Sequence, residues 1–567
     1  MIIDKIKNLY SRKKYLVLGI FSCILLFFLI VLPLIMVIET SFKDKNGFFS
    51  FDSWAKLINE EHLIAINNSL LLGLCVSLLS SLIALPCAFI MSRTRLRKIW
   101  WLDIILMIPF MIPPYINSMG WMEFMGRNGI LYRLNPIFEP FCNSFFSFFG
   151  MVWIMSLHTF PFLMTIMKNA FLNLPKSLDD ACKIYSKNKF KNLIKVYTPI
   201  LLPNFAIGLF LVFVKALAEY GTPATFGLKI NYIVFSTLIT DYMQVAPIDF
   251  SLASSLATIL LSICLILWIL QMIITNKKVY FMKKEKVSEP KENIILTFFY
   301  GFILVLIFSI SAIIPFYSIF TCSIKKISYY GFTKDNITFE YYSSLFHDDT
   351  GFGTGFNAIK NSFIIGITSG IIIFIIGILI TIFVIRHKKT KISKIMEFIS
   401  TLPQMVPNIV LGIGLIMLYS SIRRYIPIYR TVFMLIIGYT IIFLPTMISY
   451  IKNALIQVPN SLFEAGDIYS KSQFKVNLRI VLPLALKGAF YGFIMVFIVS
   501  LRELVTAKLL QPSSFYTMSL YIDYQYQQGN QQVAMALAVV SIFLTLILLI
   551  PLEFFMNYKT KKGQIWK

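Results

Sequence analysis

Long apolar runs divided by short polar segments are the main pattern of hydrophobic and polar positions along this chain. Each run is long enough to form a helix that crosses a bilayer, which needs about 20 apolar residues. Eight runs contain no charged side chain: Tyr15–Ile38, Leu63–Ser92, Phe250–Asn276, Ile294–Ser323, Asn361–Ile385, Phe398–Ile422, Thr431–Ile451 and Gln532–Leu552. Four more carry one or two charges: about Ile99–Met125, Ser144–Met167, Val196–Ala218 and Ile480–Leu501. The pattern predicts an all-α membrane protein with twelve transmembrane helices.

One polar segment between these runs occurs twice, 284 residues apart. The first copy extends from Pro175 to Pro199 and reads PKSLDDACKIYSKNKFKNLIKVYTP. The second extends from Pro459 to Pro483 and reads PNSLFEAGDIYSKSQFKVNLRIVLP, identical at 11 of 25 positions without a gap. A polar loop that repeats this well predicts two equivalent docking sites for one kind of soluble partner.

The repeat extends to both halves of the chain. Further matching pairs are Ala65–Ser69 with Ala358–Ser362, Pro109 and Pro113 with Pro403 and Pro407, and Glu219 with Glu503. Each half has six predicted spans, and an even number inserts both halves in the same orientation. We therefore predict two parallel six-helix repeats, 1–275 and 294–567, with coupling loops at about 172–199 and 456–483. A charged cytoplasmic linker, 276–293, would join them.

Composition and charge agree with a membrane setting. Hydrophobic residues make up 57% of the chain and mean hydropathy is +0.75, more apolar surface than a soluble protein could bury. If the N-terminus is cytoplasmic, 35 of the 52 basic residues lie in inside segments, which predicts that both termini are cytoplasmic. The basic inside segments account for the net charge of +25, with membrane lipid as an expected partner, and no loop is large enough to bind nucleic acid.

The repeated loop has the local chemistry of a short helix. A serine in each copy is a good N-cap, followed three residues later by an acid, and the second copy forms a capping box. Small residues come next and would leave a flat face that a partner can approach closely, and a further serine lies where the helix should end. These candidate docking residues are Ser177, Asp180, Ala181, Cys182 and Ser186 in the first copy, and Ser461, Glu464, Ala465, Gly466 and Ser470 in the second. A basic loop lying on lipid is the alternative, which would not need this pattern.

Two further pairs of residues are pathway candidates. Pro113 and Pro407 fall inside apolar spans, where they are either packing kinks or breaks in helices that line a pathway. Glu219 and Glu503 lie at the outer ends of the fifth and eleventh spans. They either line the pathway or form salt bridges at the membrane rim, with Lys215 or Arg502 nearby.

Catalytic and metal-binding patterns are missing from the sequence. No GxxxxGK[ST] phosphate loop occurs, so ATP would have to be bound by another chain. The seven cysteines are scattered and predict small core residues. His347-Asp348-Asp349 predicts a solvated turn, because adjacent side chains rarely converge on one ion, and His158 predicts a hydrogen-bonded core histidine. We predict no metal site and no cofactor bound by this chain.

The repeated loops resemble the EAA loop of importer permeases of the ATP-binding cassette class. The second copy matches with Glu464-Ala465-Gly466 and the closing Ile480–Pro483, and the first with Asp180-Ala181-Cys182 and the closing Val196–Pro199. Both copies depart from the pattern at the second alanine and have serine in the glycine place. The resemblance implies that each loop is a coupling helix that docks on an ATPase. It implies as partners two copies of that ATPase, which bind ATP and Mg, and an extracytoplasmic substrate-binding protein. It also implies a bacterial inner-membrane location.

Segments outside the loops look like fused, double-length permeases of the ferric-iron type. They are Pro109–Trp121, Gly126–Leu131 and Glu219–Gly227. Permeases for thiamine, polyamines or aminophosphonates look similar, so these substrates are alternatives. The rival class is an ion-coupled secondary transporter with parallel halves, which would need ionisable residues near the membrane midplane.

Overall fold

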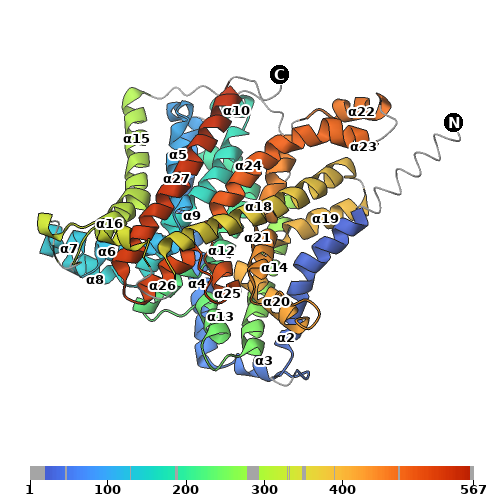
Figure 1. Cartoon of the computed structure of the whole chain (residues 1–567). Helices are drawn as coiled ribbons and strands as arrows, with labels where there is room; N and C mark the ends of the chain where they lie inside the picture. Colours follow the sequence, from blue (N-terminus) through green and yellow to red (C-terminus); the bar gives the residue numbers. More distant parts are fainter. Residues whose placement is uncertain are drawn as a thin grey trace. The chain divides into compact units, whose positions relative to one another are not determined.

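The computed structural model describes residues 19–44, 47–127, 129–185, 189–277, 293–327, 330, 333–347, 353–388, 390–456, 458–469 and 473–561 (Figure 1). Within these ranges the chain is helical, with no strand and two isolated bridges, Lys43–Phe49 and Lys325–Ile337. This confirms the predicted all-α fold.

Ten helices of the described ranges are long and apolar enough to cross a membrane. They are Gly19–Ser41, Glu60–Arg93, Phe148–Leu172, Lys195–Ala218, Phe250–Thr275, Ile294–Ser323, Gly355–Arg386, Val432–Ile456, Asn477–Ser500 and Gln531–Leu552. Two bent pairs, Trp101–Met111 with Pro114–Leu134 and Lys391–Gln404 with Asn408–Ser421, raise the count to the predicted twelve if each pair is one span.

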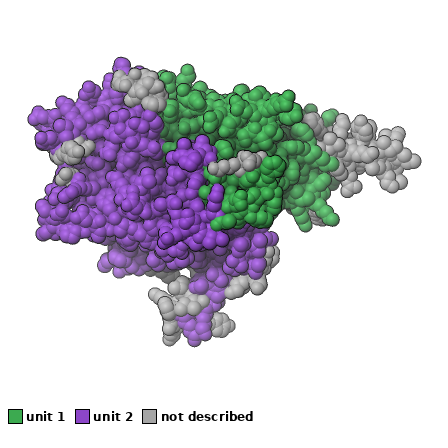
Figure 2. Space-filling view, turned by 90° about the horizontal axis from the view of Figure 1, so that it is seen from below, with its two compact units in different colours: residues 1–55, 249–258, 348–521 green, residues 56–248, 259–347, 522–567 purple. Residues whose placement is uncertain are grey.

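Contacts group the chain into two compact units (Figure 2). Unit 1 consists of residues 1–55, 249–258 and 348–521, and unit 2 of residues 56–248, 259–347 and 522–567. Each unit therefore combines most of one sequence repeat with the first span of the other, and unit 2 also contains the last span of the second repeat. The predicted halves rest on the sequence repeat and stay a prediction, and most of the predicted linker, 278–292, lies outside the described residues.

Helices of unit 1 are η1 Phe27–Val31, α2 Leu32–Ser41, α18 Gly355–Arg386, α19 Lys391–Thr401, η8 Leu402–Gln404, α20 Asn408–Ser421, α21 Val432–Ile456, α22 Asn460–Tyr469, α23 Gln473–Val476, η9 Asn477–Val481, α24 Leu482–Ser500 and α25 Val505–Leu510. Helices that cross the boundary between units are α3 Asp52–Lys56, α14 Phe250–Lys277 and α26 Met518–Gln527.

Helices of unit 2 are α4 Glu60–Arg93, η2 Arg95–Lys98, α5 Trp101–Met111, α6 Pro114–Met125, α7 Ile130–Leu134, η3 Pro136–Phe138, α8 Glu139–Phe145, α9 Phe148–Leu172, α10 Lys176–Tyr185, α11 Lys189–Asn192, η4 Leu193–Tyr197, α12 Thr198–Ala218, η5 Pro223–Gly227, α13 Phe235–Gln244, α15 Ile294–Phe308, η6 Ser309–Ile313, α16 Ile314–Ser323, η7 Lys334–Asn336, α17 Glu340–Ser344 and α27 Gln531–Lys561.

The core of each unit is a trio of packed spans, α4, α9 and α12 in unit 2 and α18, α21 and α24 in unit 1. Close approach depends on a glycine at the same place in each trio. A Cβ on Gly73 would lie 3.0 Å from the ring of Phe213, and one on Gly366 would lie 2.8 Å from the ring of Phe497. Small residues that admit a neighbouring helix are typical of membrane packing.

Wide π-helical turns occur at matching places in the two repeats. The turns η1 and η6 precede Pro33 and Pro315, and η4 and η9 precede Pro199 and Pro483. Each proline is the second residue of the helix that follows its turn. A proline supplies no N–H to the helical ladder, which accounts for the local change of register.

Each unit also contains a close seam between a broken span and a first span. In unit 2, a Cβ on Gly120 of α6 would lie 2.6 Å from the carbonyl oxygen of Pro315 in α16. In unit 1, a Cβ on Gly414 of α20 would lie 2.4 Å from the carbonyl oxygen of Pro33 in α2. The repeat seen in the sequence therefore continues into the packing, down to single glycines.

Candidate coupling helices and transport path

Both copies of the repeated loop contain a short helix, α10 and α22. They begin at Lys176 and Asn460, one residue before the serines predicted as N-caps, so Ser177 and Ser461 lie in the first turn. The carbonyls of the preceding prolines accept the first bonds, from Leu178 N at 3.2 Å and Leu462 N at 3.1 Å. Proline has a backbone angle already suited to a helix, which accounts for the earlier start.

The small residues of these helices face the chain itself. Cys182 is buried, and its carbonyl accepts a hydrogen bond of 3.1 Å from Asn192. A Cβ on Gly466 would lie 2.9 Å from the Val476 side chain and 3.0 Å from that of Ile480. We expected the small residues to leave an outer face flat, but at these two positions they admit the segment that follows the helix.

Large apolar side chains point outward from the same helices. Ile184 and Ile468, which match in the repeat, are both 80% exposed, and Tyr469 is 91% exposed. Among the predicted docking residues, Ser177, Ser461 and Glu464 are exposed, whereas Asp180, Ala181 and Ala465 are half-buried. Sequence reasoning missed the isoleucines, although their identity in the two copies was a signal. Ser186 and Ser470 lie outside the described residues.

Matching arginines anchor both loops to the ends of long spans. Arg93, at the end of α4, donates a hydrogen bond of 3.3 Å to the carbonyl of Leu174. Arg386, at the end of α18, lies 5.9 Å from the ring of Phe463 in α22. Burial lowers the pKa of the neighbouring His387, a hydrogen bond to the Phe383 carbonyl acts against this, and the charge of Arg386 lowers the pKa further. The lowered pKa favours the neutral form of His387.

A pair of equivalent salt bridges lies at the ends of neighbouring spans. Lys168 in α9 and Asp103 in α5 form one at 2.5 Å, and Lys452 in α21 and Glu397 in α19 form the other. All four side chains are partly exposed, which keeps each pair weak. The two salt bridges therefore join equivalent helices, α5 with α9 in unit 2 and α19 with α21 in unit 1.

Both proline sites are broken helices. The chain bends by 85° between α5 and α6 and by 108° between η8 and α20. Pro113 and Pro407 precede the second helix of each pair with nearly the same backbone angles, φ −54° and −57° and ψ 137° in both. In an unbroken helix the Pro109 carbonyl would accept a hydrogen bond from the backbone N–H of residue 113, but Pro113 has no N–H. His158 Nδ1 lies 3.1 Å from this carbonyl. This agrees with the prediction of a hydrogen-bonded core histidine.

Both candidate acids bind the start of the helix that follows them. Glu219 accepts a hydrogen bond from Thr222 N at 3.2 Å. Glu503 accepts bonds from Thr506 N at 3.1 Å, Thr506 Oγ1 at 2.9 Å and Asn408 Nδ2 at 3.4 Å. These bonds give the acids a capping role that we did not consider from the sequence, where the alternatives were a pathway or rim salt bridges.

The matching motifs Ala65–Ser69 and Ala358–Ser362 cap the next helices. Asn68 and Asn361 each donate a 3.0 Å bond to a carbonyl just before α13 and α26. Ser69 and Ser362 each accept a 2.7 Å bond from the first backbone N–H of those helices. The repeat in sequence thus encodes a repeated set of hydrogen bonds.

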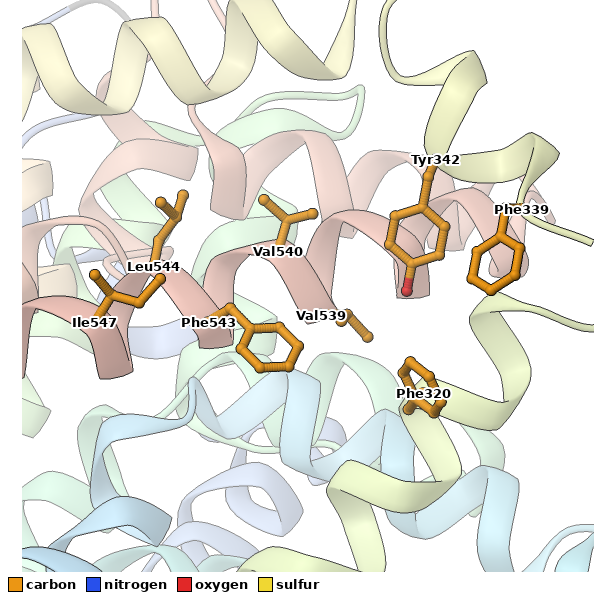
Figure 3. Close-up of a pocket in the computed structure, with 8 residues that line it drawn as sticks. All are labelled: Phe320, Phe339, Tyr342, Val539, Val540, Phe543, Leu544 and Ile547. Atoms are coloured by element: carbon orange, nitrogen blue, oxygen red, sulfur yellow. The ribbon is translucent and has the colours of Figure 1, made fainter.

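An apolar groove of about 400 Å³ lies on unit 2 (Figure 3). Its lining side chains come from α16, α27 and the segment around α17: Phe320, Phe339, Tyr342, Val539, Val540, Phe543, Leu544 and Ile547. Because nearly all of the lining is hydrocarbon, the groove does not suit a polar solute. Within the described ranges no group of three His, Cys, Asp or Glu residues could hold a metal ion, and Asp348 and Asp349 lie outside those ranges.

Comparison with known proteins gives these features a context. Residues 373–558 match the family of binding-protein-dependent transport system inner membrane components. The chain is 25% identical to the putative ferric transport system permease protein FbpB 1 of Haemophilus influenzae, over 83% of this chain and 74% of that protein. It is 24% identical to the ferric transport system permease protein FbpB of Actinobacillus pleuropneumoniae, over 92% of this chain and 76% of that protein.

A shorter relative bears on the double length of the chain. The spermidine/putrescine transport system permease protein PotB of Salmonella typhimurium is 23% identical over 48% of this chain and 98% of its own length. Half of this chain therefore covers nearly all of a single permease. The chain is thus similar to membrane permeases that work with a binding protein, and its long apolar helices suit a multi-pass membrane protein.

Proposed function

We propose that this chain, a double-length permease of the binding-protein-dependent kind, is the transmembrane subunit of an ATP-driven importer for ferric iron. The binding protein delivers its solute at the outer face. Two copies of a separate ATPase, which bind ATP and Mg, act on the inner face. Closure of the ATPase pair switches the broken helices between outward-open and inward-open states. Both termini are cytoplasmic in this arrangement.

The observation that carries the proposal is the pair of exposed isoleucine side chains on α10 and α22. Ile184 and Ile468 are 80% exposed in a polar loop. An exposed isoleucine there contributes no hydrophobic stabilisation to the folded chain. Apolar side chains that project from a rigid helix into a partner's pocket are typical of binding hot spots. The fixed positions of α10 and α22 against the following segments, through Cys182 and Gly466, would transmit the partner's motion to α12 and α24.

Ferric iron is the proposed substrate because two relatives that cover most of the chain have names that specify ferric transport. The polyamine relative matches only half of the chain, so a polyamine is the weaker alternative. Thiamine and aminophosphonate stay open from the sequence likeness.

Copurification tests the docking. The chain is expressed with a candidate partner ATPase from the same genome, and the complex is isolated through a tag on the chain. Ile184→Asp and Ile468→Asp should each reduce the bound ATPase, and the double variant should abolish it, because a charge enters an apolar contact. Exposed Leu228, which lies outside the loops, provides the control Leu228→Asp. Normal ATPase recovery with the double variant would contradict this docking surface.

A further inference from the structure

The second half of the broken span in unit 2 contains buried polar atoms that have no hydrogen-bond partner in the described part of the chain. Asn117 is fully buried, and neither its amide nitrogen nor its amide oxygen has a hydrogen-bond partner among the described residues. The indole nitrogen of Trp121, a residue that is 3% exposed, is unpaired in the same sense. Unpaired buried polar atoms are rare in native proteins, and each needs a physical explanation.

These atoms share one side of α6. Residues four apart on a helix are neighbours on its surface, so Asn117 and Trp121 form one polar patch. The Trp121 ring is held in place by stacking on Phe145, with ring centroids 5.5 Å apart. Other positions of α6 serve packing: Ser118 bonds to Thr225 Oγ1 at 2.9 Å, and Gly120 meets Pro315.

The facing helix contributes to the polar character. Ser311 in η6 and Ser318 in α16 lie one turn to either side of Pro315, the residue that meets Gly120, and both are fully buried. Helical spacing places the three residues on one face. The seam between α6 and α16 is therefore lined with small and polar groups.

The equivalent seam in unit 1 is apolar. At the places of Asn117 and Trp121, α20 has Leu411 and Leu415, both buried. At the places of the two serines, unit 1 has Leu29 in η1 and Met36 in α2. Since the glycine–proline contact is the same in both seams, packing alone does not require the polar residues.

We propose that Asn117 and Trp121 form a hydrogen-bonding site for the transported solute, and that this solute carries acceptor oxygens. This inference rests on the proposed importer function. The patch offers N–H donors from both side chains and one amide acceptor, and it begins in the first turn of α6, where the helix dipole is positive. Oxygen atoms of an oxyanion, or of ligands bound to a metal ion, match these donors. A polyamine carries N–H donors and would leave them unpaired.

Transport by the complete complex in vesicles tests this binding site. Uptake is measured for radiolabelled iron supplied as ferric citrate, for sulfate and for putrescine. Asn117→Leu, which copies the second repeat, should reduce uptake of the oxygen-bearing solute about tenfold, the effect of one lost hydrogen bond in a dry site. Trp121→Phe removes the N–H, keeps the stacked ring and should reduce uptake in the same direction. Loss with ferric citrate points to oxygens on a metal ligand, and loss with sulfate points to an oxyanion.

A matched control separates this effect from packing. Trp54→Phe removes another buried indole N–H without a partner among the described residues, outside the broken spans, and should leave uptake unchanged. Stimulation of ATP hydrolysis by the loaded binding protein should stay at the wild-type value in the Trp54→Phe control, and the melting temperature should not fall in either α6 variant. Wild-type uptake by both α6 variants, an equal loss in the control, or preferred uptake of putrescine would overturn the inference. Failure of the wild-type complex to accumulate any of the solutes would instead count against the importer function itself.

Discussion

The helices α6 and α20 are equivalent in the two repeats, because each follows a proline break with nearly the same backbone angles. Each also has a glycine against the carbonyl of a matching proline, Pro315 or Pro33. Their other buried residues differ. In α6 these include Asn117 and Trp121, and in α20 they are Leu411 and Leu415. The shared features, which include the caps, the salt bridges and the π-helical turns, maintain the shape of both repeats. The difference shows that a duplicated fold can keep its backbone geometry in both repeats and have buried polar side chains at these positions in only one of them.

The largest effect is expected from making the apolar seam polar. Leu411→Asn should lower the free energy of unfolding by about 1–3 kcal/mol for the unpaired amide, with a further loss of packing. The reverse change, Asn117→Leu, should be neutral or stabilising because it removes unpaired polar atoms. Unfolding in a mixed-micelle denaturation series measures both. A stable Leu411→Asn variant would show that the α20 seam already holds a partner for an amide.

A somewhat smaller loss is expected at the acid caps. Glu503→Ala removes bonds from Thr506 and Asn408, and charge-assisted bonds of this kind contribute about 1.5–3 kcal/mol. Glu503→Gln keeps an acceptor oxygen and should retain most of the stability. Uptake by the Gln variants of Glu503 and Glu219 then decides the separate question of a pathway role. Uptake equal to that of the wild type in the double Gln variant would leave capping as their role.

The shared glycine contact should give similar losses in both units. Gly120→Ala and Gly414→Ala place a methyl group against a backbone carbonyl that cannot move aside, and overpacking of this kind costs about 1–3 kcal/mol. Thermal melting of each variant, with Gly301→Ala as a control in open space, measures the effect. A loss in only one unit would break the equivalence of the seams.

The smallest effects belong to the paired salt bridges. Asp103→Asn and Glu397→Gln should each cost about 0–1 kcal/mol, since all four side chains are partly exposed. The loss should shrink at high salt, and a melting series from low to high ionic strength checks this. A large, salt-independent loss would mean that one pair is coupled to buried charges.

Hydropathy and the internal repeat were sufficient to predict the apolar spans and a short helix in each repeated loop. At Pro113 and Pro407 the sequence left a packing kink and a broken helix as alternatives. Local pattern could not reveal which way a small residue faces, so Gly466 was assigned to an outer surface, although it admits Val476 and Ile480. It could not show the caps formed by Glu219 and Glu503, because these bonds depend on the turn after the span. Nor could it single out Asn117, because its lack of a partner among the described residues is a property of the packed fold.

Uptake by purified components tests the central claim most directly. Vesicles that contain the chain and its ATPase, with ATP inside and the binding protein outside, are supplied with radiolabelled ferric iron. The account predicts accumulation that requires ATP, the ATPase and the binding protein together, and that is lost in the Ile184→Asp and Ile468→Asp double variant. Accumulation driven by an ion gradient across vesicles that contain the chain alone would contradict it.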